Sequence, residues 1–494
     1  MEAHQTEYAI NSEHSINRSI FKNISPLDHR YSLSEESLFN AMVPWISEEA
    51  ALRACVKAEI ALVIAHLAVR GKATPEVRAQ LEKAGNSVDP AEVYVEEEKT
   101  RHNIRALVNV LKKKLPAEYS PLIHLGATSV DILDTSLAWR IRGVTREVAL
   151  PELKKLELLL CDLAEKEAET PQVGRTHGQH ALPITVGFAI AEYVSRLGKS
   201  ILEIKRLEKN LKGKLAGAVG SYNATAMIVK DPEELERLYL AELGLEPSEH
   251  STQLVEPEYL LRLLLEFNTA FGIIANLADD LRNLQRSEIG EFHEGFSAQQ
   301  VGSSTMPQKR NPWNSEHVKS LWKAFMPRAL TFFMDQISEH QRDLSNSASQ
   351  RFIADYVAGF VLAVSRMGQV IESLQVDRER LKANLKAAGS ALLAEPAYIL
   401  LAESGVTDAH EVIRKLTLAA EKENLSFAQA LAREKETLSA IAVKMAELGL
   451  IKTDGADSVT AAALAWFENP EHYRGLAEKK ARSIAAKYRG EIDV

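Results

Sequence analysis

The chain has 494 residues, of which 46% are hydrophobic and 26% are charged, with 24 glycines and 17 prolines. This composition excludes collagen-like, low-complexity and largely disordered proteins, and its low share of turn formers favours helices over many short strands. The 68 acidic and 59 basic residues give a net charge of -9, which excludes a general attraction to nucleic acid or anionic membranes.

The first thirty residues lack the apolar core of a signal peptide, and no stretch resembles the roughly 18 to 20 apolar residues that span a bilayer. Cys55 and Cys161 are the only cysteines. Two thiols in so long a chain argue against a disulfide framework and fit a reducing compartment. The sequence contains neither a His-Glu-x-x-His zinc motif nor a phosphate-binding glycine loop. We therefore expect a cytoplasmic protein without a metal or a cofactor.

Short polar turns separate the helices predicted between residues 34 and 115. Asp89 and Pro90 suit the N-cap and the first turn of one of these helices. That helix would carry Glu98 and His102 one turn apart.

Four long helical patterns dominate the middle of the chain. Apolar residues recur every three or four positions over about 185–211, which predicts a helix of roughly 40 Å. Further helices are expected over 257–286, from about 314 onward with a kink at Pro327, and over 351–374. Helices of this length require a bundle, whose core other subunits can complete.

Beyond residue 375 the predicted helices become shorter and more charged. We place one domain boundary there and another near Leu125. The sequence therefore predicts an all-α fold with an N-terminal helical domain (1–125), a central bundle of long helices (126–374) that builds a multi-subunit helical core, and a C-terminal helical domain (375–494).

The segment 302–312 interrupts two strong helical patterns. It contains paired serines, two prolines and the adjacent cations Lys309 and Arg310, so it cannot form a regular helix. A basic surface connector is the simplest interpretation of this composition alone. A catalytic loop is the alternative, and the polar segments elsewhere in the chain favour it.

Three of these polar segments, 100–103, 124–129 and 174–180, combine an imidazole with hydroxyl or guanidinium donors. A lone histidine is more often structural than catalytic. His177, however, precedes Gly178 just before a long predicted helix, where backbone amides would bind an anion.

The other two segments resemble parts of an anion-binding wall. His102 follows Arg101, and His124 is followed by Thr128 and Ser129. Hydroxyl and guanidinium donors at such spacing suit a ligand that carries phosphate or carboxylate groups.

Arg342 and Arg351 flank a serine-rich stretch. On one straight helix they would point in opposite directions, so both can face one ligand only if the helix begins after the serines. A serine-capped helix start with ion-paired arginines and a ligand-binding segment both remain open.

Several of these blocks together resemble a known family. The loop 302–312 follows blocks at 124–134 and 174–187, in the order found in the aspartase, fumarase and argininosuccinate lyase superfamily. Within it the chain is most similar to the adenylosuccinate lyase family, through segments 30–32, 99–102, 175–178, 217–220, 251–253 and 342–345. The similarity covers about residues 30 to 435. Asn103, where many members have Asp, and 254–257, where they have a basic run, depart from the pattern, so the substrate within the superfamily stays open.

The resemblance implies a β-elimination that breaks a C–N bond and releases fumarate, with adenylosuccinate and the succinyl-aminoimidazole-carboxamide nucleotide as substrates. It assigns the base to Ser303. His177 would be the general acid, Lys309 would stabilise the developing aci-carboxylate, and Asn311 would be a further donor. The residues expected to hold the phosphate, nucleoside and carboxylates are Arg30, Tyr31, Arg101, His102, His124, Thr128, Ser129, Gln253, Arg342, Ser347 and Arg351.

The resemblance also implies a homotetramer in which three chains build each site, with no nucleic-acid or membrane partner. Three alternatives remain open. The chain could be another lyase of the superfamily, related to argininosuccinate lyase or carboxymuconate cycloisomerase. It could also be a non-catalytic structural relative or a nucleotide-sensing module.

Overall fold

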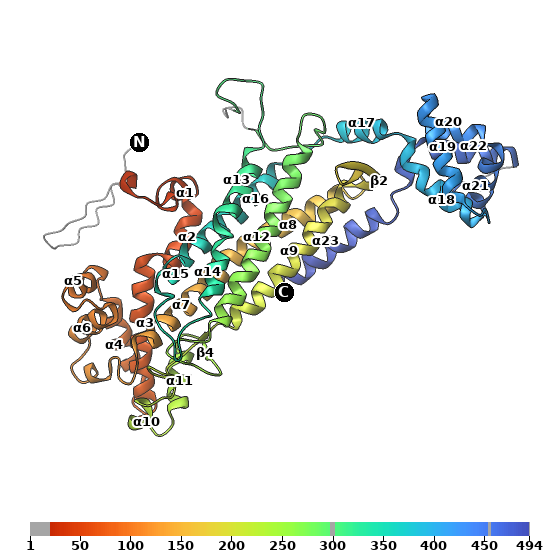
Figure 1. Cartoon of the computed structure of the whole chain (residues 1–494). Coiled ribbons are helices and arrows are strands. Elements are labelled where there is room, and N and C mark those ends of the chain that lie inside the picture. The colour runs from red at the N-terminus through yellow and green to blue at the C-terminus, as the bar shows by residue number, and fades with distance from the viewer. Residues whose placement is uncertain (1–19, 297–301, 453–455, 494) are drawn as a thin grey trace. The chain divides into compact units, whose positions relative to one another are not determined.

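The computed structural model in Figure 1 describes residues 20–296, 302–452 and 456–493. Nearly all of its elements are helices, which confirms the all-α prediction. The chain divides into two compact units. The first unit holds residues up to 154, 200–274 and 320–366, and the second holds 155–199, 275–319 and the chain from 367.

The long helices form as the apolar periodicity predicts, and the unit boundaries fall within them. They are α8 (Leu150–Lys166), α9 (Val186–Lys209), α12 (Glu258–Leu284), α13 (Trp313–Phe325) and α16 (Ile353–Ser373). The third predicted helix breaks completely at Pro327, where only a kink was predicted, and α14 (Arg328–Met334) begins after it. The proline ring removes one backbone donor and disfavours helical geometry in the preceding residue.

Shorter helices complete the first unit. They are α1 (Arg30–Ser34), α2 (Glu36–Ile46), α3 (Glu48–Ala68), α4 (Pro75–Asn86), α5 (Pro90–Thr100), α6 (Asn103–Lys114), α7 (Ser129–Val144), α10 (Thr225–Ile228), α11 (Pro232–Ala241) and α15 (Ser347–Arg351). The α5 cap confirms the prediction, because the Asp89 carboxylate accepts the Ala91 N–H at 2.9 Å.

The C-terminal end of α5 corrects one prediction. Arg101 adopts a left-handed conformation with φ of 52°, which ends the helix. His102 then becomes the N-cap of α6, where its Nδ1 accepts the Arg105 N–H at 3.3 Å. The prediction that Glu98 and His102 share one helix was therefore wrong.

Aromatic side chains join α12 and α16 in the core of the first unit, where Figure 1 shows the two helices side by side. Phe267 and Phe360 stack with ring centroids 4.8 Å apart, and Phe271 meets Phe360 edge-on at 5.6 Å. The Tyr356 hydroxyl donates to the Leu264 carbonyl at 3.0 Å, so this buried polar group is satisfied. Burial of each such side chain contributes about 1.5 to 3 kcal/mol.

The second unit contains the C-terminal helices. They are α17 (Arg378–Ala388), α18 (Ala394–Glu403), α19 (Ala409–Glu423), α20 (Phe427–Arg433), α21 (Lys435–Glu447), α22 (Ala456–Glu468) and α23 (Ala477–Asp493). Helices α18 to α22 share a hydrophobic core that includes Leu393, Phe427 and Phe467. The last helix, α23, lies along α9, where the Tyr488 ring packs against Gly198 (Figure 1).

The described residues also form three small two-stranded sheets, which the helical patterns do not predict. Strands β1 (Pro171–Thr176) and β2 (Gln179–Thr185) form an antiparallel hairpin, β3 (Lys212–Gly213) and β4 (Glu246–Pro247) pair in parallel, and β5 (Phe292–His293) pairs antiparallel with β6 (Gln375–Val376). Hairpin β1–β2 shifts register between Val173 and Arg175. The hairpin directly precedes α9 and therefore carries the 174–180 segment.

Helix α12 corrects the expectation that no stretch could span a bilayer. Among the described residues it is the one straight helix that is long and apolar enough to cross a membrane, and the helix pair 378–388 and 390–403, which is bent by 68°, passes the same test jointly. A helix that is apolar on several faces is also what the centre of a helical bundle requires. Its aromatic contacts with α16 are of that kind.

Candidate active site

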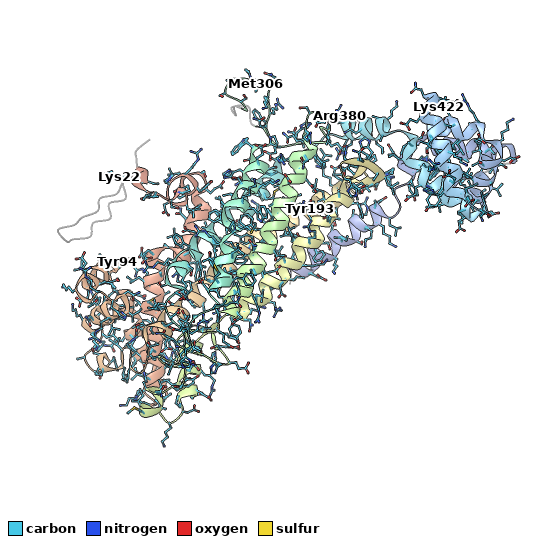
Figure 2. The ribbon with its side chains drawn as sticks, in the orientation of Figure 1. Lys22, Tyr94, Tyr193, Met306, Arg380 and Lys422 are labelled. Carbon is cyan, nitrogen blue, oxygen red and sulfur yellow. The ribbon has the colours of Figure 1, made fainter. Side chains whose placement is uncertain are left out.

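The loop 302–312 lies in the second unit, immediately before α13, and Figure 2 shows Met306 at its outer end. The Ser303 Oγ accepts the Met306 N–H at 3.1 Å and the Thr305 N–H at 3.4 Å. Two backbone donors directed at one hydroxyl oxygen favour negative charge on that oxygen. The loop thus provides a serine whose ionised form has local support.

Contacts within the loop hold its first residue close to its last residues. Asn311 Nδ2 donates to the Gly302 carbonyl at 3.0 Å. A Cβ at residue 302 would lie 2.2 Å from the Lys309 carbonyl oxygen, so this close approach requires glycine. The Lys309 side chain is exposed, and the Arg310 guanidinium lies over the Phe296 ring at 5.3 Å.

A buried carboxylate outside the loop positions the helix that follows it. Glu294 accepts the backbone N–H of Ser315 at 2.8 Å and that of Asn314 at 3.2 Å, which caps α13. The backbone of Glu294 is in turn held by Gln285 at 2.8 Å. Sequence analysis missed this residue, because the capping carboxylate lies 21 positions before Ser315 and not at the helix start.

His177 lies at the tip of the β1–β2 hairpin and is exposed. His177 and Gly178 have φ of 56° and 74°, the geometry of a two-residue hairpin turn between Thr176 and Gln179. Helix α9 begins only at Val186. The predicted position of His177 at a helix N-terminus was therefore wrong, and the residue lies exposed at the tip of a hairpin instead.

Arg175 anchors this hairpin to the segment that leads into the loop. Its guanidinium forms an ion pair with the fully buried Glu291 at 2.6 Å. Gln172 and Asn384 donate to the same carboxylate at 2.8 Å and 2.9 Å. A carboxylate with this many donors is well compensated in a buried setting. Glu291 is a second positioning residue that sequence analysis missed.

Within the described part of the chain, no hydrogen bond or ion pair joins His177 to Ser303 or Lys309. The four predicted catalytic residues all belong to the second unit. The predicted substrate-binding residues all belong to the first unit.

In the first unit the structure brings two predicted binding residues together. His102 Nε2 lies 3.4 Å from Ser129 Oγ. Thr128 precedes α7, and its N–H donates to the Asp131 carboxylate at 2.7 Å, the N3 half of a capping box. His124 lies in the turn before this helix and adopts φ of 57°.

A fully buried ion pair between Asp131 and Lys214 holds this end of α7 to the 215–220 segment. The Asp131 carboxylate also accepts the N–H groups of Ala216 at 3.1 Å and Gly217 at 3.3 Å. Thr135 Oγ1 donates to the Lys214 carbonyl at 3.2 Å. The spacing of Thr128 and Asp131 in the sequence is typical of a helix capping box. No nearby sequence pattern predicts that Lys214 pairs with Asp131.

The remaining predicted binding residues are spread over several elements of the first unit. Arg30 and Tyr31 open α1, and the Gln253 N–H donates to the Gln341 carbonyl at 3.2 Å. Arg342 lies before α15, with φ of 82°, and Ser347 begins that helix.

Arg342 and Arg351 therefore do not share one helix. The Arg342 guanidinium donates to the carbonyls of Gln336 at 2.7 Å and Asp335 at 2.8 Å. Arg351 is exposed at the end of α15. Arg342 thus has a structural task in this chain, whereas Arg351 is accessible to a ligand.

Comparison with known proteins finds relatives of this chain over most of its length. Residues 24–324 match the family model described as "Lyase", and residues 338–450 match the model "Adenylosuccinate lyase C-terminal". Two solved structures share the fold with a TM-score of 0.75: a 3-carboxy-cis,cis-muconate lactonizing enzyme from Pseudomonas putida (23% identity, 93% of this chain and 99% of that one) and a fumarate lyase from Mesorhizobium (21%, 90% and 97%). The first of these family models covers more than half of the chain, so the chain belongs to this family of lyases.

Curated relatives narrow the class. An adenylosuccinate lyase from Pyrococcus horikoshii is 34% identical over 84% of this chain and 90% of its own length. The enzyme from Methanocaldococcus jannaschii is 32% identical over 85% and 90%, and that from Aquifex aeolicus is 29% identical over 68% and 76%. The chain belongs to the adenylosuccinate lyase family.

Proposed function

We propose that this protein cleaves adenylosuccinate to AMP and fumarate, and that the same site cleaves the succinyl-aminoimidazole-carboxamide nucleotide of purine biosynthesis. The observation that carries the proposal is the 34% identity over 84% of the chain to an adenylosuccinate lyase. The two family models, which together match most of residues 24–450, support it.

The reaction requires a proton to leave a carbon that is next to a carboxylate. We assign this proton to the Ser303 oxygen. The electrons of the C–H bond then form the double bond of fumarate, and those of the C–N bond pass to the departing nitrogen. His177 gives that nitrogen a proton, the general-acid role that imidazole side chains most often fill in enzymes.

Charge stabilisation is the main demand of this step, because proton removal adds negative charge to a group that is already anionic. Lys309 supplies the positive charge and Asn311 a further donor. The backbone amides of Met306 and Thr305 that donate to Ser303 Oγ support the serine in its ionised form. Water exclusion around the loop would strengthen all of these interactions.

Substrate binding is assigned to the polar residues of the first unit. A succinylated nucleotide carries about four negative charges, which guanidinium, imidazole and hydroxyl donors can hold within an otherwise acidic protein. The residues assigned to binding are Arg30, Tyr31, Arg101, His102, His124, Thr128, Ser129, Gln253, Arg342, Ser347 and Arg351. Of these we assign Arg342 mainly to shaping the site, because its guanidinium donates to backbone carbonyls.

We infer a homotetramer in which neighbouring chains complete each site. An exposed apolar surface, which we call the α14 surface, supports this inference. This name covers the exposed apolar residues of the segment 330–352, which are Leu330, Phe333, Met334, Ile337, Leu344 and Phe352 and are between 46% and 82% exposed. Exposed apolar side chains gathered on one short segment are typical of an interface between subunits.

Solution mass and subunit mixing test the assembly. Light scattering is expected to give four times the chain mass of 54.7 kDa. Mixing inactive Ser303→Ala and His177→Ala variants is expected to restore up to about a quarter of the wild-type activity if the two residues of one site come from different chains. A monomeric mass would contradict the assembly, and mixtures without activity would contradict shared sites.

We further propose the three-domain division at residues 125 and 375, and a cytoplasmic location. The separate hydrophobic core of α18 to α22 supports the second boundary. Cys55 and Cys161 are both free and buried, which fits a reducing compartment.

The function is tested by measuring fumarate release from purified protein offered adenylosuccinate, argininosuccinate or a carboxymuconate. Turnover of adenylosuccinate is expected to exceed that of the other two by orders of magnitude, because a site built to pair with one set of polar groups leaves them unpaired with another. Turnover of argininosuccinate alone would assign the chain to a different reaction of the superfamily. Tight nucleotide binding without any turnover would make it a binding module.

A further inference from the structure

The turn that carries His124 has a strained backbone. His124 has φ of 57° and Gly126 has φ of 80°, and a Cβ at Gly126 would lie 2.9 Å from Thr225 Cγ2. A left-handed histidine is uncommon and persists only where its surroundings hold it. The contacts that hold it come from helix α3.

Both carboxylate oxygens of Glu59, which lies on α3, contact His124. Oε1 lies 2.7 Å from the His124 Nδ1, and Oε2 accepts the backbone N–H of His124 at 3.0 Å. Glu59 is fully buried, whereas 23% of the His124 side chain is exposed. A buried carboxylate needs compensating donors, and here the backbone N–H and the ring Nδ1–H of His124 provide them.

His66, two turns further along α3, holds the same turn from its other side. His66 Nε2 lies 2.8 Å from the Leu125 carbonyl, and Arg70 donates to His66 Nδ1 at 3.3 Å. This arrangement requires a proton on Nε2 and a free lone pair on Nδ1, which is a neutral imidazole. Burial lowers the pKa of His66, in agreement with that form.

His124 differs from His66 in charge. Burial alone lowers the pKa of His124, but the hydrogen bond and the charge of Glu59 outweigh it and leave the pKa above its usual value. Asp131 of α7 acts in the same direction, and Arg105 of α6 opposes it. With Nδ1 bound to Glu59, the His124 Nε2 has no hydrogen-bond partner among the described residues.

We propose that Glu59 is a positioning residue of the active site, which keeps His124 protonated and directs its Nε2–H toward an anionic group of the substrate. The inference rests on the proposed function for the identity of that substrate. Helix α3 thereby supplies, through two side chains seven residues apart, both the orientation and the charge of a ligand-binding imidazole. This is the carboxylate–histidine arrangement by which proteins fix the tautomer and raise the basicity of a functional ring.

The proposal predicts a pH profile. A substrate contact that requires imidazolium is lost as the pH rises through the pKa of His124. Glu59→Gln retains the shape of the side chain but removes its charge, so the alkaline limb of kcat/KM for fumarate release should move to lower pH. Each unit by which the limb moves lowers kcat/KM about tenfold on its alkaline side. At acidic pH, where His124 is protonated in both proteins, the difference should be small.

A second measurement gives the pKa of the His124 ring in the absence of catalysis. Deuterium exchange at the His124 ring carbon, followed by peptide mass spectrometry across a pH series, yields the pKa of this one histidine. We expect a value above that of an exposed imidazole in the wild type and a lower value in Glu59→Gln. His66 is an internal control, because its value should lie below that of an exposed imidazole in both proteins.

Glu208→Gln is the matched control variant. Glu208 is a buried carboxylate of the same unit that pairs with Arg146 at 2.9 Å, far from this turn along the chain. It should change neither the pKa of His124 nor the alkaline limb. If Glu59→Gln does not fold, the wild-type exchange curve and the variant Glu59→Asp, which keeps the charge, still test the proposal.

The outcomes separate the two claims. A wild-type His124 pKa at or below that of an exposed imidazole would overturn the proposal, as would a Glu59→Gln protein whose His124 pKa falls while the kcat/KM limb stays in place. Absence of fumarate release from the wild type would overturn the proposed function. The exchange data would then still report whether Glu59 sets the charge of His124.

Discussion

At the scale of single residues, Ser303 is the clearest case. Its hydroxyl is a poor base near neutral pH, and the two backbone amides that donate to it are the local means of stabilising its ionised form. Ser303→Ala removes the proton acceptor, so fumarate release is expected to fall by at least about a thousandfold. Binding of adenylosuccinate, measured by calorimetry, should change little. Ser304→Ala, at the exposed neighbouring position, should retain most of the rate, and equal losses in the two variants would point to loop distortion instead.

The burial of Glu157 on α8 predicts how the free energy of unfolding depends on pH. Its side chain is fully buried, and neither carboxylate oxygen has a hydrogen-bond partner among the described residues. Burial raises the pKa of Glu157 from 4.5 to about 9. The folded chain therefore binds a proton that the unfolded chain releases, and the free energy of unfolding falls as the pH rises from about 4.5 to about 9.

Glu157→Gln removes this titration. Near pH 5 the two proteins should unfold at similar temperatures. Toward pH 8 the variant should become the more stable one, by on the order of 1.4 kcal/mol for each pH unit above the unfolded pKa. Scanning calorimetry at both pH values measures the difference. Parallel stability curves for the two proteins would show that Glu157 stays ionised in the fold.

At the scale of elements, the contact between α23 and α9 can be separated from the rest of the fold. A Cβ at Gly198 would lie 2.3 Å from Tyr488 Cδ1. Gly198→Ala should therefore displace Tyr488 and loosen α23, at a cost of about 1 to 3 kcal/mol. Amide exchange in residues 477–493 should become faster.

The double variant Gly198→Ala, Tyr488→Ala tests whether the clash is the cause. Removal of the ring makes room for the new methyl group, so the double variant should be less destabilised than the sum of the two single variants. Additive losses would mean that the glycine matters for another reason. The ion pair of Arg489 with Asp162 at 2.7 Å, which also ties α23 to α8, remains in every variant.

At the scale of the whole molecule, the α14 surface predicts how the assembly can be broken. Ile337 is 82% exposed in the single chain. Ile337→Glu places a charge in the inferred interface, where desolvation without a partner is costly, so the solution mass should fall below that of the wild type. Fumarate release should fall with it if neighbouring chains complete the sites.

Leu418→Glu is the control for this prediction. Leu418 is 50% exposed on α19, outside the α14 surface. Its replacement should leave both the mass and the rate unchanged. An Ile337→Glu protein that keeps its full mass would exclude this surface from the interface.

The sequence predicts the helical elements well, because a helix is defined by periodicity within one continuous segment. The ends of α9 and α12 lie within two residues of the predicted positions. The hairpin that carries His177 was missed, although a His-Gly pair suits a turn that needs two positive φ angles. Its strands, 171–176 and 179–185, are short and lie before the predicted helix start at about residue 185, in a segment for which only polar ligand-binding residues were expected.

The order of the polar blocks along the chain is likewise a property of the sequence, and it indicates the family before any coordinates are considered. The hydrogen-bond and ion-pair partners of these polar residues cannot be predicted from the sequence in this way. Glu59 meets His124 across 65 positions, and Glu291 meets Arg175 across 116. No local sequence pattern identifies the partner of a buried carboxylate. The two residues meet because apolar helix faces pack together, and the pattern of those faces does not depend on which polar residues they bring into contact. The order of the polar blocks along the sequence is thus enough to predict the class of reaction. The charge and orientation of each functional group depend on tertiary contacts between residues far apart in the sequence.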